Sequence, residues 1–176
     1  MLIESDLLPK DFNYNKYVKD HNLVELIGDE LDYLPIDFSS KLINPPTLSV
    51  DPNNNLPFPP EFDDLSRLHF LTCTRKVTTI LEFGVGKSTV VFGNALSLNK
   101  DKYYGFTSKN LRRGNLYECH SIDNQRNWID KCRNTIPKDL LAKGFNNLHI
   151  SSLAISEFCG RVCTFYDPLP NICPDL

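Results

Sequence analysis

The feature that most constrains the fold is the stretch at residues 80–89, ILEFGVGKST, where a mostly apolar run leads into two closely spaced glycines. Residues 77–83, VTTILEF, are rich in β-branched and apolar side chains, which is typical of a strand buried on both faces of a parallel sheet. Residues 88–98 then place apolar side chains at helical spacing. A strand, a glycine turn and a helix in succession predict the first half of a strand–helix–strand unit.

The same alternation continues along the chain. An amphipathic helix is predicted over 124–136, where Pro137 stops it, and a further helix, with acids in its first turn, is predicted from Glu61 to Lys76. The predicted loop insertion covers 99–116, which are polar and punctuated by glycine. The remaining predicted strands are 117–122 (YECHSI), 148–153 (LHISSL) and a short one at 160–166 (GRVCTFY). Strands alternating with helices predict an α/β fold with a parallel sheet.

The first 60 residues differ in character from the rest. Residues 16–34 can form a helix, although their apolar spacing fits a helix only in part. Residues 45–60 contain many prolines and three consecutive asparagines, a composition typical of an extended linker or arm. We therefore divide the chain into an N-terminal extension and linker at 1–60 and an α/β domain at 61–176.

Composition excludes several function classes. The net charge of −3 provides no field that would attract nucleic acid or an anionic membrane. The start of the sequence lacks a secretory signal pattern, and no apolar stretch is long enough to span a bilayer. None of the six cysteines forms a CxxC pair or lies beside histidines at zinc-ligand spacing. We expect a cytoplasmic protein with free thiols, no bound metal, and neither nucleic acid nor membrane as a partner.

The glycine turn matches two nucleotide-binding templates incompletely. A phosphate-binding P-loop reads GxxxxGK[ST]; Gly86, Lys87 and Ser88 fit its end, but Leu81 stands where the first glycine is needed. Glu82 would also bring negative charge close to a triphosphate. The dinucleotide template GxGxxG fits at Gly84 and Gly86 but has Thr89 at its third glycine. Neither template is favoured.

A third pattern, an acidic residue followed by xGxG at a strand end, fits completely through Glu82, Gly84 and Gly86. Two glycines let the backbone pass close to a ligand, and a carboxylate can balance an ammonium or sulfonium charge. Asp123 stands at the end of the second predicted strand, where an acid can accept hydrogen bonds from both ribose hydroxyls of an adenosine. Asp123 can also cap the helix that follows it.

This pattern resembles motif I of class I S-adenosylmethionine-dependent methyltransferases. The resemblance covers about residues 61–176, through EFDDLSRLHF, ILEFGVG, HSIDNQRNWIDKCR and LPNICPDL. It implies a Rossmann-like parallel sheet flanked by helices, with S-adenosylmethionine as the cofactor. Lys87 departs from the family, which commonly has an aromatic or small residue there. The cofactor-binding residues that the resemblance implies are Glu82, Phe83, Gly84, Val85, Gly86, Ser88, Thr89, Asp123, Asn124, Ser151 and Ser152.

The resemblance also implies that the domain is incomplete. In the family a fourth core strand would begin about where the sequence ends, at PDL, so this chain resembles a domain truncated after its third core strand. Two functions stay open: a methyltransferase, or its cofactor-binding fragment, acting on a small-molecule or sugar-like acceptor, and a non-catalytic remnant or interaction module. A completing chain or a homo-oligomer would cover the open sheet edge. No catalytic base is assigned: His69, His120 and His149 are candidates only by residue type, and His120 and His149, which lie within predicted strands, are expected to be packing residues.

Overall fold

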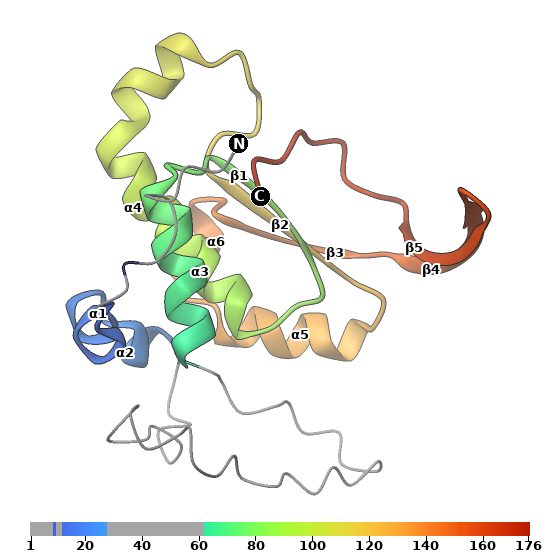
Figure 1. Cartoon of the computed structure of the whole chain (residues 1–176), viewed down its shortest axis with the longest axis horizontal. Coiled ribbons are helices and arrows are strands. Elements are labelled where there is room, and N and C mark those ends of the chain that lie inside the picture. Colours follow the sequence, from blue (N-terminus) through green and yellow to red (C-terminus); the bar gives the residue numbers. More distant parts are fainter. Residues whose placement is uncertain (1–8, 10–11, 28–61) are drawn as a thin grey trace, which may run out of the picture.

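The computed structural model describes residue 9 and residues 12–27 and 62–176, which fold into helices and two small sheets (Figure 1). In chain order the elements are α1 (Tyr14–Asp20), α2 (Leu23–Ile27), α3 (Phe62–Thr74), β1 (Thr79–Phe83), α4 (Lys87–Asn110), β2 (Glu118–Asp123), α5 (Arg126–Thr135), α6 (Lys138–Ala142), β3 (Asn146–Ile150), β4 (Ser152–Phe158) and β5 (Arg161–Asp167).

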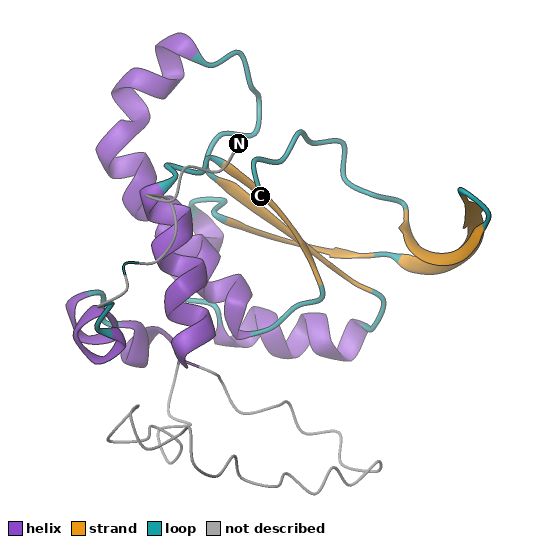
Figure 2. Ribbon diagram, in the orientation of Figure 1, coloured by secondary structure: helices purple, strands orange, loops and turns teal. Residues whose placement is uncertain are grey.

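The central sheet contains three parallel strands in the order β1-β2-β3 (Figure 2). Ile80 lies beside Cys119, and Cys119 lies beside Asn146, so the carboxyl ends of all three strands meet at one edge. Helices α4 and α5 both pack against β2 and β3, and α3 packs against α4. The predicted α/β fold with a parallel sheet is confirmed.

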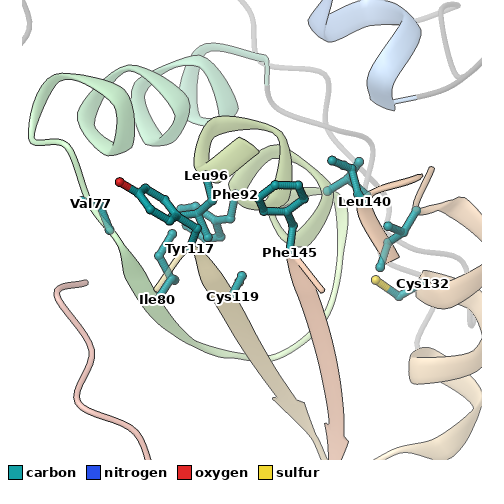
Figure 3. Packing of buried hydrophobic residues seen from close by; sticks show 11 residues of the cluster. Val77, Ile80, Phe92, Leu96, Tyr117, Cys119, Cys132, Leu140 and Phe145 are labelled. Carbon is teal, nitrogen blue, oxygen red and sulfur yellow. The ribbon is translucent and has the colours of Figure 1, made fainter. Parts of the chain in front are cut away.

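The core lies between α4 and the sheet (Figure 3). Ile80 and Cys119 come from the strands, Leu96 comes from α4, and all three side chains are buried. Full burial of an aliphatic side chain contributes roughly 1.5–3 kcal/mol. Gly93 lets α4 approach β3 closely, because a Cβ at this position would lie 2.0 Å from the Asn146 side-chain oxygen.

Helix α4 is longer than expected and continues to Asn110, so the predicted loop insertion at 99–116 is wrong over its first two thirds. Polar residues of this segment find partners in the fold. The buried Asn99 amide donates to the carbonyls of Thr72 and Val77 at 2.9 and 3.0 Å. The Thr107 hydroxyl lies 2.8 Å from the Tyr117 hydroxyl, in a buried hydrogen bond. These tertiary contacts stabilise the second half of α4, whose polar composition by itself is typical of a loop.

The third predicted strand, 148–153, is divided between two sheets. The central sheet takes β3, which starts at Asn146 and ends at Ile150, whereas Ser152 begins β4. Strands β4 and β5 pair antiparallel as a hairpin that extends away from the helices (Figure 1). The short strand predicted at 160–166 is confirmed as β5, but it belongs to the hairpin.

The last residues of the chain lie along the free edge of β1. The Leu81 amide donates to the Leu176 carbonyl at 2.8 Å, and the Asp175 amide donates to the Thr79 carbonyl at 2.7 Å. The Asp175 carboxylate accepts from the Thr78 amide at 2.8 Å and pairs with Arg113. This edge of β1 is therefore occupied over its first half by main-chain and side-chain hydrogen bonds.

The helix predicted at 16–34 is present as two short helices, α1 and α2, over the part that is described. Residues 28–34 and the predicted linker at 45–60 lie outside the described residues. Within 12–27 and 62–176, no helix has both the length and the apolar character needed to cross a membrane.

Candidate functional site

Glu82 occupies the carboxyl end of β1 and is buried beneath the start of α4. Its two carboxylate oxygens accept hydrogen bonds from the hydroxyls of Ser88 at 2.5 Å and Thr89 at 2.7 Å. Burial raises the pKa of this carboxyl group, and hydrogen bonds from Ser121, Ser88 and Thr89 partly offset the rise. Glu82 therefore ties the glycine turn to both α4 and β2.

The glycine turn follows directly above this carboxylate. Gly84 has a φ of 91°, a conformation that favours glycine, and its amide donates to the Ile122 carbonyl at 2.7 Å. Among the described residues other than its chain neighbours, a Cβ at Gly84 or Gly86 would meet no atom within 4 Å, so the space beside the turn is open to that part of the chain. The Gly86 amide donates to the Thr89 hydroxyl at 3.0 Å, which closes the first turn of α4.

Asp123 ends β2 directly beside this turn. One carboxylate oxygen accepts from the Val85 amide at 3.3 Å, and the other accepts from the Gln125 amide at 2.8 Å. Asp123 is half-buried, and each oxygen keeps a further lone pair. The structure thus brings together the two acids that the sequence separates by 40 residues, and Asp123 also holds the chain entering α5.

The other implied cofactor residues lie around the same edge of the sheet. Asn124 is exposed in the turn between β2 and α5. Ser151 is buried beyond the end of β3, where its amide donates to the Asp123 carbonyl at 3.0 Å and its hydroxyl donates to the Pro168 carbonyl at 2.8 Å. Ser152 is exposed at the start of β4. Ser151 therefore links the site to the base of the hairpin.

Phe83, the last residue of β1, is 60% exposed. Its ring stacks on the ring of Tyr166 from β5, with centroids 5.7 Å apart and planes 15° apart. Burial raises the pKa of Tyr166, and the nearby charge of Asp123 raises it further. The aromatic pair therefore stands at the same edge of the sheet as the two acids.

Lys87 and the histidines have partners away from this edge. The Lys87 ammonium donates to the Ile27 carbonyl at the end of α2, at 2.6 Å. His120 lies 2.9 Å from both His149 and Glu118, measured between side-chain atoms. His69 is buried between Tyr17 of α1 and Asn94 of α4. Each of the three histidines is therefore engaged in side-chain contacts within the fold.

Two residues of this site carried no usable sequence signal. Side chains of β2 alternate between the two faces of the sheet, so residues 119, 121 and 123 share one face. Ser121 lies beside Glu82 in the register, and its hydroxyl donates to the Glu82 carboxylate. Ser121 lies within a predicted strand, but no pattern in the sequence distinguishes it from its neighbours. Tyr166 reaches Phe83 through the register of the hairpin, which no short motif encodes.

Comparison with protein-family models, with curated proteins and with solved structures found no match. Among the residues that the structure describes, no group of three or more histidine, cysteine or acidic side chains is arranged to hold a metal ion.

Proposed function

We propose that this chain binds S-adenosylmethionine at the carboxyl edge of its parallel sheet, as a methyltransferase or as the cofactor-binding part of one with a Rossmann-like fold. The observation that carries the proposal is the pairing of Asp123 with the glycine turn. The Asp123 carboxylate accepts from the Val85 amide at 3.3 Å and still has lone pairs for two ribose hydroxyls.

The open turn fits such a cofactor. Apart from the chain neighbours, no atom of residues 12–27 or 62–176 lies within 4 Å of where a Cβ would stand at Gly84 or Gly86, which leaves the main chain there accessible to a ligand. Glu82 places a carboxyl group directly beneath the turn, where an ionised carboxylate favours a cationic ligand. Its oxygens are already engaged by Ser88 and Thr89, so we assign Glu82 an electrostatic and positioning role.

The same geometry disfavours a polyphosphate ligand. A P-loop lysine must reach the phosphates, but the Lys87 ammonium is bound to the carbonyl that ends α2. The Gly86 amide is taken by Thr89 and is therefore not free to cradle an anion. A buried acid beneath the turn would add repulsion.

Isothermal titration calorimetry with S-adenosylhomocysteine tests the proposal. We expect micromolar binding that Asp123→Asn weakens at least tenfold, because an amide presents only one acceptor oxygen to the two ribose hydroxyls. Asp130→Asn is the matched control, since Asp130 is an exposed acid on the following helix. Lys87→Ala should leave binding unchanged.

Two results would contradict the proposal. One is wild-type protein that does not bind S-adenosylhomocysteine. The other is magnesium-dependent ATP binding that disappears in Lys87→Ala, which would restore the P-loop interpretation. Transfer of a labelled methyl group to candidate small-molecule acceptors separates an active methyltransferase from a module that binds the cofactor without chemistry.

A further inference from the structure

The base of the β4–β5 hairpin lies over the same edge of the sheet as the candidate site. The hairpin starts immediately after Ser151, whose amide is bound to the Asp123 carbonyl, and it returns at Pro168, whose carbonyl accepts from the Ser151 hydroxyl. Tyr166 lies two residues before Pro168 and reaches the Phe83 ring at the end of β1. The returning strand therefore connects the end of β3 with the end of β1.

The two rings are in contact and leave no room between them for a third. A ring inserted between them would need about 7 Å, since stacked aromatic atoms lie about 3.5 Å apart, whereas the centroids are 5.7 Å apart. Phe83 nevertheless keeps more than half of its surface exposed. A flat ligand group can therefore stack on the outer face of the pair, but not inside it.

Phe83 directly precedes Gly84, and in the register of the sheet it lies beside Ile122, the residue before Asp123. A ribose held by Asp123 would therefore carry its base into the neighbourhood of this aromatic pair. We propose that Phe83 and Tyr166 form a stacking platform for the adenine base of the bound nucleoside. This inference rests on the proposed function and makes the hairpin a wall of the cofactor site.

Substitution of Tyr166, with its neighbour Phe165 as the control, tests the platform. Phe165 is also partly exposed. It precedes Tyr166 in β5, and because successive side chains of a strand point to opposite faces, Phe165 faces the side of the hairpin away from Tyr166. By calorimetry, Tyr166→Ala should weaken binding of S-adenosylhomocysteine and of adenosine about tenfold, because the platform on which the base stacks loses one of its two rings. Tyr166→Phe and Phe165→Ala should stay within about twofold of wild type.

The outcomes distinguish the platform from the cofactor proposal. If wild type binds S-adenosylhomocysteine and Asp123→Asn weakens binding, but Tyr166→Ala does not, the platform is wrong and the cofactor site stands. If Phe165→Ala weakens S-adenosylhomocysteine binding as much as Tyr166→Ala does, the platform is also wrong, because the loss of affinity then comes from disturbing the hairpin as a whole. If wild type does not bind S-adenosylhomocysteine, both proposals fail. Phe83→Leu, at the other ring, should reproduce the loss seen in Tyr166→Ala.

Discussion

The central sheet and the β4–β5 hairpin are both built from strands, but they bury their side chains very differently. Ile80 and Cys119 of the central sheet are buried against α4. In the hairpin, Ile155 is 77% exposed and Val162 is 81% exposed. A two-stranded ribbon is at best marginally stable in water. The hairpin therefore depends on its attachment at Ser151 and Tyr166, whereas the sheet is stabilised by its own core.

Truncation of a core residue should show the difference most strongly. We expect Leu96→Ala to lower the free energy of unfolding by about 2–5 kcal/mol, because it removes a fully buried side chain from between α4 and the sheet. Ile155→Ala, the hairpin control, should change it by less than about 0.5 kcal/mol. Urea denaturation measures both values. An Ile155→Ala cost close to that of Leu96→Ala would break the comparison, because it would mean that the hairpin is covered in solution.

The helical layer behind the sheet should also respond to pH through His69. Burial lowers the pKa of His69 to about 4. A hydrogen bond to Asn94 raises this pKa in part, and the nearby His21 lowers it further. Because the folded pKa lies below the unfolded value of 6.5, the stabilisation is present above pH 6.5 and is lost as the pH falls toward 4. The free energy of unfolding should therefore decrease by roughly 3 kcal/mol over this pH range.

Urea denaturation of wild type and His69→Gln between pH 7 and pH 4 measures this contribution. The variant should be less stable at pH 7, since the hydrogen bonds to Tyr17 and Asn94 are disturbed. Its stability should then fall less steeply with acidification than that of wild type. Parallel pH curves for the two proteins would show that His69 does not carry the effect.

Glu82 should distinguish a structural carboxyl group from a ligand-binding one. Glu82→Ala leaves the hydroxyls of Ser88 and Thr89 without their acceptor, at a cost of about 1–3 kcal/mol. Glu82→Gln keeps one acceptor oxygen, and it replaces a carboxylate whose charged form is disfavoured by burial, as its raised pKa indicates. We therefore expect Glu82→Gln to cause little loss of stability. Thermal unfolding and binding of S-adenosylhomocysteine should be measured on both variants. Normal binding in Glu82→Gln would assign the carboxylate to the fold alone.

The sequence predicted the elements whose signal is local. The strand before Gly84, the helix after Pro60 and the amphipathic helix ended by Pro137 all have patterns that hydrophobic packing dictates. The second half of α4 was missed because its stability comes from distant partners, such as the Tyr117 hydroxyl that bonds to Thr107. The short helix α6 after Pro137 was missed as well.

The candidate site shows the same limit. The position of Glu82 and Asp123 at one edge of the sheet could be predicted, because an acid at a strand end beside glycines is a local pattern and parallel strands bring such ends together. The Phe83–Tyr166 contact could not be predicted, because local patterning assigns residues 148–153 to one strand of the parallel sheet and residues 160–166 to a separate short strand, and it does not pair them as a hairpin. Register between distant strands depends on the whole fold rather than on any short window.

The smallest expected effect concerns the attachment of the hairpin. Ser151→Ala removes the hydroxyl that donates to the Pro168 carbonyl, a hydrogen bond worth about 1 kcal/mol if the hairpin unfolds together with the sheet. If the hairpin opens by itself, global stability will stay within about 0.3 kcal/mol of wild type, and only amide exchange in β4 and β5 will become faster. Because few apolar side chains of the hairpin are buried, we expect the second result. Hydrogen exchange read by mass spectrometry on hairpin and β1–β3 peptides decides between them: faster exchange in both sheets would show that they form one cooperative unit.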